Sequence, residues 1–125
     1  MSRAYDGSMT RALEGPEAGQ VHCDAGLTAV FTLLGKRWSG MLLGTLLAGP
    51  ARFGELASAI PGITESMLSA RLSELQDAGL VSREVVPGPP VGTIYRLTEE
   101  GVALRPALTA LTSWAETYLT TERRR

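Results

Sequence analysis

Several residue types that build active sites and metal sites are scarce in this sequence. The 125 residues contain one cysteine, Cys23, and one histidine, His22. A single cysteine excludes a disulfide within the chain and suits a reducing cytoplasm, and two such ligands are too few for a zinc site within one chain. The sequence also lacks a glycine-rich phosphate loop and a set of nucleophile, base and orienting residue. We therefore expect no enzyme, no cofactor and no metal.

Excess charge of one sign and long apolar runs are missing as well. The formal net charge is −1 at pH 7, which argues against a strong nonspecific binder of nucleic acid but is compatible with a local basic patch. No apolar run approaches the roughly 20 residues that span a bilayer, and the amino terminus lacks the order of a signal peptide. The composition predicts a cytoplasmic protein of one globular domain without membrane contact.

The clearest pattern is a pair of helices joined by a tight turn within residues 51–80. The first helix has apolar residues at i, i+3, i+4 and i+7, namely Phe53, Leu56, Ala57 and Ile60. Pro61 and Gly62 then favour a turn. Thr64 is placed to cap the second helix with its hydroxyl, and Gly79 to end it. With a buried stripe at Leu68, Leu72 and Leu75, the pattern predicts a helix-turn-helix.

The second helix has small and hydroxylated side chains opposite its apolar stripe. They are Ser66, Ser69, Ala70 and Ser73, followed by Asp77. Small side chains let a helix approach a duplex closely, and serine bonds to either a base edge or a phosphate. A surface helix without any ligand also looks like this, so the helix alone leaves DNA binding and plain packing open.

After Gly79 the apolar period changes from helical to two. Residues 81–85 alternate, and residues 93–97 alternate again, with Thr93, Tyr95 and Leu97 on one face. The intervening PGPPVG has three prolines and two glycines, which predict a protruding loop. A helix-turn-helix followed by a β-hairpin is the winged variant of the motif, and this order favours DNA binding. The predicted fold class is therefore mainly α (α+β), with a two-stranded wing.

Helices are also expected on both sides of this motif. Residues 27–34 predict a short buried helix and residues 38–48 a central core helix, with Trp38 packed at its start. After Pro106, which kinks a helix or restarts it, an apolar stripe runs along the last helix. Its members are Leu104, Leu108, Leu111, Ala115 and Tyr118, widened by Trp114 and Leu119. A partner subunit is its expected cover, and the chain's own first helix is the alternative. A polar arm is expected at residues 1–20, the folded domain at 21–120 and a basic tail at 121–125.

Residues 23 to about 118 resemble the HxlR-type winged-helix transcriptional regulators. The matching pieces are Cys23 ahead of the first helix, LLGKRW, GPARFGELASAIPGI, MLSARLSELQDAGLVSREV, YRLTEEG and Trp114. The resemblance implies a bacterial-type regulator of nearby genes and a homodimer joined through N- and C-terminal dimerisation helices. It also implies a recognition helix at 64–77 and a wing at 80–97 on double-stranded DNA. The candidate dimer contacts are Leu27, Leu104, Leu108, Leu111, Trp114, Ala115 and Tyr118.

The candidate DNA contacts depart from the family's pattern at two places. The candidates are Arg52, Thr64, Ser66, Ser69, Ala70, Arg71, Ser73, Arg83 and Arg96. Members usually carry basic or amide side chains on the recognition face, which is nearly neutral here. Their wing usually contains PPRVEY, whereas this chain has PVGTIY, with Gly92 in place of the arginine. Replacing Gly92 with arginine is therefore expected to add a phosphate contact. Each of the four candidate arginines has a surface ion pair as its alternative role.

Cys23 is a candidate redox sensor on the strength of the same resemblance. In several members the cysteine at this place senses oxidants or electrophiles near the dimer interface. The alternative is a small buried apolar side chain. Two other functions stay open: a regulator with a small-molecule effector in an apolar pocket at the dimer interface, and a winged-helix module that binds protein instead of DNA.

Overall fold

The computed structural model describes residues 21–119. The predicted arm at 1–20 and the predicted tail at 121–125 lie outside these residues. The chain divides between Leu33 and Leu34 into two compact units, and almost all of α3 (Ala25–Leu34) belongs to the first. Within the part of the chain that is described, no helix is long and apolar enough to cross a membrane.

Helix α3 begins two residues earlier than the apolar pattern predicts because Asp24 caps it. The Asp24 Oδ1 accepts a hydrogen bond from the Leu27 backbone N–H at 3.0 Å, which satisfies one of the free donors at the helix start. None of the residues of α3 is buried, so the prediction of a buried helix was wrong. A short apolar run does not distinguish a core helix from one whose apolar side chains remain uncovered by their own chain.

The core of the second unit forms around α4 (Ser39–Leu47), as predicted. Leu42 and Leu43 are fully buried there. Trp38 precedes the helix in a left-handed conformation with φ of 84°, which is uncommon for a residue with a side chain. Its ring is buried, and a Cβ on Gly62 would lie 3.5 Å from the ring's Cη2 atom. Trp38 therefore packs against the turn of the helix-turn-helix, in agreement with the prediction of a structural role.

The helix-turn-helix consists of α5 (Phe53–Ala59) and α6 (Glu65–Asp77). The Thr64 hydroxyl caps α6 by accepting a hydrogen bond from the Met67 backbone N–H at 3.1 Å. Such a cap stabilises a helix by about 1 kcal/mol. At the other end Gly79 is left-handed, with φ of 81°, and the Leu80 N–H donates to the Leu75 carbonyl at 3.0 Å. The predicted apolar stripe of α6 is buried; its members are Leu68, Leu72 and Leu75.

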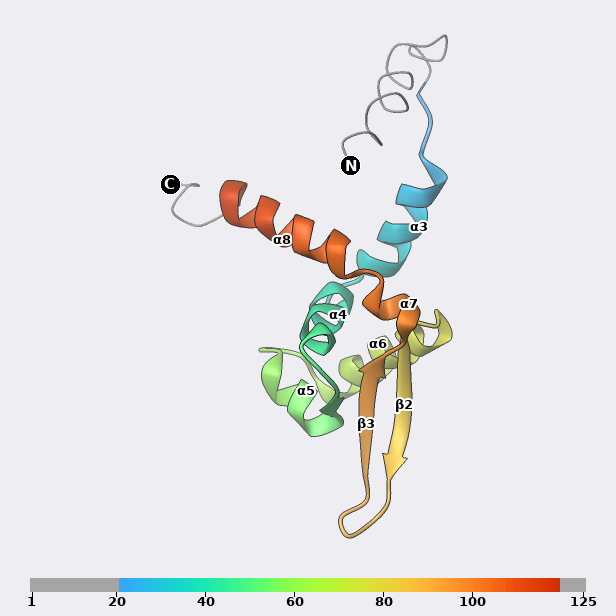
Figure 1. Ribbon diagram of the computed structural model, residues 1–125, viewed down its shortest axis with the longest axis vertical. Coiled ribbons are helices and arrows are strands. Elements are labelled where there is room, and N and C mark those ends of the chain that lie inside the picture. Colours follow the sequence, from blue (N-terminus) through green and yellow to red (C-terminus); the bar gives the residue numbers. More distant parts are fainter. Residues whose placement is uncertain (1–20, 120–125) are drawn as a thin grey trace. The chain divides into compact units, whose positions relative to one another are not determined.

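Three short strands form an antiparallel sheet in the order β1-β3-β2. They are β1 (Ala51–Arg52), β2 (Val81–Val86) and β3 (Gly92–Leu97). Strands β2 and β3 make the wing, which projects beyond α5 and α6 in Figure 1. Because β1 pairs with β3, Arg52 lies opposite Ile94 at the base of the projecting part. Tyr95 is buried, and its ring centroid lies 6.4 Å from that of Phe53.

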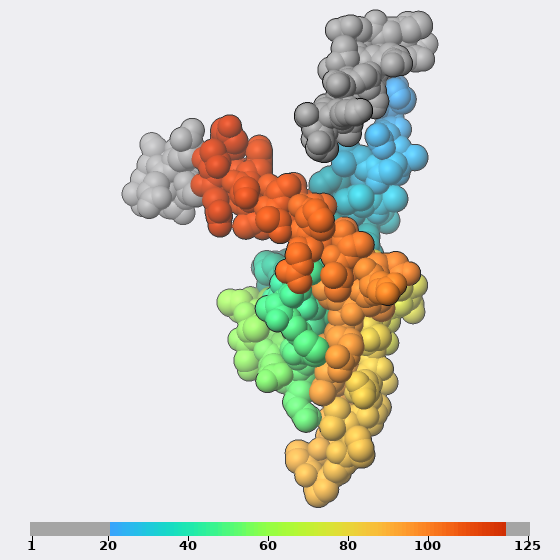
Figure 2. All heavy atoms as spheres, viewed as in Figure 1, coloured from blue at the N-terminus to red at the C-terminus, as the bar shows by residue number. Residues whose placement is uncertain are grey.

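The chain leaves the wing through α7 (Glu99–Val102) and then enters α8 (Arg105–Tyr118), whose first turn contains a proline. Of the two outcomes expected at Pro106, a kink or a restart, the structure shows the restart. The Thr98 hydroxyl accepts from the Gly101 N–H at 3.1 Å and donates to the Gly79 carbonyl at 2.7 Å. It thereby joins the end of α6 to the start of α7. In Figure 2 the atoms of α8 extend away from the winged core.

Candidate nucleic-acid interface

The exposed face of α6 is small and carries almost no charge. All four of its candidate contacts are open to solvent: Ser66, Ser69, Ala70 and Ser73. Thr64, at the amino end of the helix, is also exposed although its hydroxyl is engaged as the cap. The buried leucines hold this face outward, so a duplex groove can approach the helix backbone without displacing long side chains.

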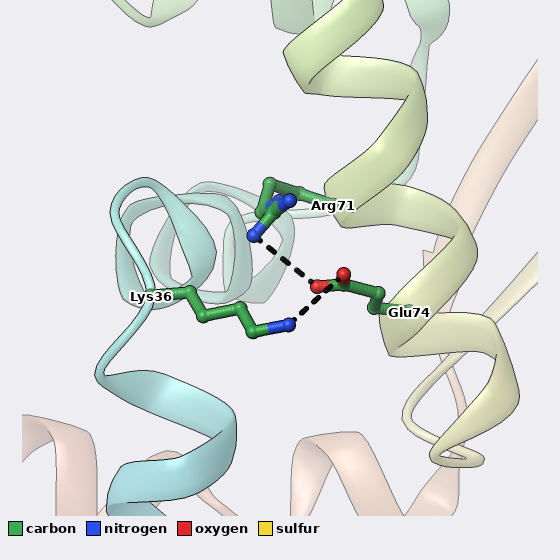
Figure 3. Close-up of polar contacts among 3 residues, drawn as sticks. All are labelled: Lys36, Arg71 and Glu74. Carbon is green, nitrogen blue, oxygen red and sulfur yellow. Dashed lines mark hydrogen bonds and ion pairs between the residues drawn. The ribbon is translucent and has the colours of Figure 1, made fainter.

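Two basic residues near this face are held by one carboxylate. The Glu74 carboxylate of α6 forms ion pairs with the Lys36 Nζ at 3.1 Å and with the Arg71 Nη1 at 3.4 Å (Figure 3). Arg71 is the more enclosed of the two cations, with 16% of its side chain exposed, and its Nε is buried without a hydrogen-bond partner in the described residues. Both positive charges are therefore partly neutralised within the protein, which accords with the ion-pair alternative for Arg71.

The two arginines of the wing strands, Arg83 and Arg96, differ in whether an acidic side chain pairs with them. The Arg96 Nη2 lies 3.3 Å from the Glu84 Oε1, across the hairpin, and both side chains are largely exposed. Exposed pairs of this kind contribute about 0–1 kcal/mol, so a phosphate can compete for the arginine. Arg83 is exposed, and among residues 21–119 no acidic side chain pairs with it. Arg83 is thus the wing cation with its charge fully available.

Arg52 lies where the helix-turn-helix meets the wing. Its backbone N–H donates to the Glu55 Oε1 at 2.8 Å, while its guanidinium reaches across to Gly92. An open groove follows this junction, lined on one side by α5 from its first to its last residue and on the other by the wing residues Val91, Gly92 and Thr93. In the described part of the chain no acidic side chain forms an ion pair with the Arg52 guanidinium. The sequence could not show this junction, because Arg52 and Gly92 are distant along the chain.

Cys23 lies immediately before the residue that caps α3. Its side chain is free and exposed in the single chain. A shallow pocket beside it is lined by His22, Cys23, Asp24, Leu27, Thr28 and Phe31. The thiol is therefore open to an electrophile, with apolar side chains close by. Residues 21–119 contain no group of three or more side chains suited to hold a metal ion.

The candidate dimer contacts are mostly uncovered in the single chain. Leu27 of α3 is exposed, and on α8 about half of the surface of Leu111, Trp114 and Tyr118 is exposed. The rings of Trp114 and Tyr118 lie against each other at a tilt of 40° with centroids 5.8 Å apart, so they form one continuous apolar surface. The remaining three are half-buried: Leu104, Leu108 and Ala115.

A helix-turn-helix followed by a projecting hairpin defines this chain as a winged helix-turn-helix protein. The HxlR-like helix-turn-helix family matches residues 33–123. A curated relative, the HTH-type transcriptional regulator YodB of Bacillus subtilis strain 168, is 42% identical over 92 residues, which are 74% of this chain and 82% of YodB. The chain belongs to the HxlR-like helix-turn-helix family.

Two solved structures show the same fold. The quinone-bound form of YodB from B. subtilis is 39% identical, has a TM-score of 0.66 and is matched over 75% of this chain and 99% of its own. The redox regulator HypR in its reduced form is 31% identical, has a TM-score of 0.74 and is matched over 81% of this chain and 100% of its own. The predicted family and the predicted winged-helix class are thereby confirmed.

Proposed function

We propose that this HxlR-type regulator acts as a homodimer that binds an inverted-repeat operator, with α6 in the major groove and the β2–β3 wing along the flanking backbone. The observation that carries the proposal is the outward face of α6, where four small side chains are exposed beside a projecting hairpin. Two-fold symmetry would place the half-site centres about 10 base pairs, or a multiple of this, apart.

The uncovered apolar side chains of α3 and α8 support the dimer. On α8 alone the exposed apolar side chains lie on one face of the helix, and a contiguous apolar surface of this kind often marks an interface. Each copy offers the same surface, so a two-fold interface pairs the patch with itself. The coupling of two half-sites would also offset the weak charge of each single recognition face.

Changes on the outward face of α6 should alter DNA binding without unfolding the protein. Ala70→Glu places a carboxylate against the phosphates, and like charges at an interface cost several kcal/mol, so we expect at least a roughly tenfold loss of affinity. Ser69→Arg should instead strengthen binding to all sequences through a new phosphate contact. An electrophoretic shift with the DNA upstream of the protein's own gene measures both.

The control is Ala103→Glu, the same change at an exposed residue that follows α7. It should leave affinity near that of the parent, and circular dichroism should be alike for all the variants. If Ala70→Glu and Ser69→Arg both bind with the parent's affinity and sequence preference, α6 is not the recognition helix.

We further propose that Cys23 senses electrophiles. The thiol is exposed beside Leu27 and Phe31, which would favour a flat aromatic reagent such as a quinone. A quinone would add to the thiolate. Diamide would take two electrons and two protons from the thiols of two subunits, which would leave one intersubunit disulfide and the reduced diamide. The quinone-bound YodB structure and the redox regulator HypR are similar to this chain, which supports the proposal.

Quinone or diamide treatment should therefore change the DNA affinity of the parent protein but not that of Cys23→Ser. Serine preserves the size of the side chain while it removes the nucleophilic thiolate. A non-reducing gel should show a diamide-dependent dimer in the parent alone. If the parent and Cys23→Ser respond equally in the shift assay, Cys23 is not the sensor.

A protein-binding winged-helix module is the second candidate. It is favoured by one observation, namely that Lys36 and Arg71 are both engaged by Glu74 and leave the recognition face without a free cation of their own. Such a module would shift no duplex at low salt, where nonspecific binding is strongest. The electrophoretic experiment therefore separates the two functions.

A further inference from the structure

Gly92 is the first residue of β3. The space that a side chain on this residue would fill is taken by the side chain of another residue. A Cβ atom on Gly92 would meet the Nη1 atom of Arg52, and the next nearest atom, Arg52 Cζ, would lie 3.6 Å away. The backbone of Gly92 is outside the left-handed region, so conformational freedom does not explain the glycine. What the glycine supplies is room for the guanidinium of Arg52.

The charge of Arg52 remains available at this place. Glu55 is the acidic residue of the same groove; its Oε1 accepts a hydrogen bond from the backbone N–H of Arg52, but its carboxylate forms no ion pair with the Arg52 guanidinium. The ion pairs of the described residues all involve other cations, namely Lys36, Arg71 and Arg96. An arginine without an acidic partner, held against a hairpin backbone, is suited to bind one phosphate through its fork of donors.

We propose that Arg52 makes the phosphate contact at the base of the wing, in the position that a side chain on residue 92 would otherwise occupy. This inference rests on the proposed DNA-binding function and assigns one contact within it. The cation comes from β1, and Gly92 admits it. The Cβ of any side chain on residue 92 would take the place of the Arg52 Nη1, so an arginine at 92 displaces the Arg52 guanidinium, and the two positive charges then repel each other.

The inference changes the expected effect of Gly92→Arg. If residue 92 were merely vacant, the substitution would add one phosphate contact per subunit. If Arg52 already occupies the place, the new arginine displaces it, and the number of phosphates neutralised stays the same. The slope of log affinity against log salt distinguishes the two results, because each phosphate neutralised on duplex DNA contributes about 0.9.

The test is a cycle of four proteins: the parent, Arg52→Gln, Gly92→Arg and the double variant. Arg52→Gln should make the slope shallower by about 2 units per dimer, since two subunits each lose one contact of about 0.9. Gly92→Arg alone should leave the slope within about half a unit of the parent's, whereas in the Arg52→Gln background it should restore about 2 units. The two changes are thus strongly non-additive.

Arg83→Gln is the matched control, because Arg83 is also an exposed arginine without an acidic partner in the described residues. Its effect on the slope should be the same with and without Gly92→Arg. Thermal unfolding of each variant shows whether it is folded at the assay temperature. Additive slopes for the Arg52 cycle, or an Arg52→Gln slope equal to the parent's, overturn the inference while DNA binding stands. A parent that binds no duplex at low salt removes the proposed function and the inference together.

Discussion

Leu111→Glu combined with Tyr118→Glu should convert the proposed dimer to a monomer and remove the proposed specific DNA binding. Both side chains are about half exposed on α8 and lie on its apolar stripe. In the proposed dimer the substitutions would bury four carboxylates per interface, each at a cost of several kcal/mol. A monomer also loses the coupling between half-sites, which is worth roughly 100-fold to 10,000-fold in affinity. The molar mass measured by light scattering should fall from twice the chain mass to the 13.3 kDa of one chain.

The control for this variant carries the same two charges on the other side of α8. Thr109 and Ser113 are exposed and lie away from the stripe, so Thr109→Glu with Ser113→Glu should remain dimeric and bind DNA. A parent protein of about 13 kDa at micromolar concentration would contradict the dimer itself. A monomeric Leu111→Glu, Tyr118→Glu variant that still binds an operator with the parent's affinity would contradict the link between dimerisation and DNA binding.

Gly101→Ala will destabilise the fold by about 3 kcal/mol, near the upper end of what overpacking usually costs. A Cβ on Gly101 would collide with the carbonyl oxygen of Leu80 and approach the Leu97 Cδ2 to 3.1 Å. The first of these contacts is backbone, which cannot rotate away as a flexible side chain does. Urea denaturation followed by circular dichroism measures the loss as a lower midpoint at an unchanged slope.

Gly44→Ala is the same type of substitution, but it is expected to stabilise the fold. Gly44 lies within α4, and apart from its chain neighbours and the adjacent backbone of α4, no atom of the described residues would lie within 4 Å of its Cβ. Alanine in an open helical position stabilises by up to about 1 kcal/mol relative to glycine. The two variants should therefore move the urea midpoint in opposite directions. A midpoint for Gly101→Ala at or above that of the parent would show that the chain yields easily at the Leu80 carbonyl.

The helix-turn-helix was predictable because its determinants are local in the sequence. Thr64 and the residue it caps are three positions apart, the leucines of α6 recur at helical spacing, and Gly79 supplies the left-handed end. The wing followed from the change of period to two and from the prolines of its loop. Each of these features is decided within a few residues, so one sequence is enough to place them.

The state of the basic residues was not predictable, because it depends on contacts between distant segments. Lys36 and Glu74 are 38 positions apart, and the Arg52 guanidinium meets a glycine on another strand. Composition shows how many cations exist but not which of them are neutralised. The same limit applies to α3, whose apolar residues predicted a buried helix although none of them is buried in the structure.

The hydroxyl of Thr98 links two segments that are far apart in the sequence. It bonds at once to the carbonyl of Gly79 and to the N–H of Gly101, two groups on segments that the chain otherwise links only through the whole wing. The Thr98 backbone N–H also donates to the Leu80 carbonyl at 3.0 Å, so two hydrogen bonds of one residue tie the segment after α6 to the start of α7. None of these bonds involves the loop between β2 and β3, so a movement of that loop would leave the link between α6 and α7 intact.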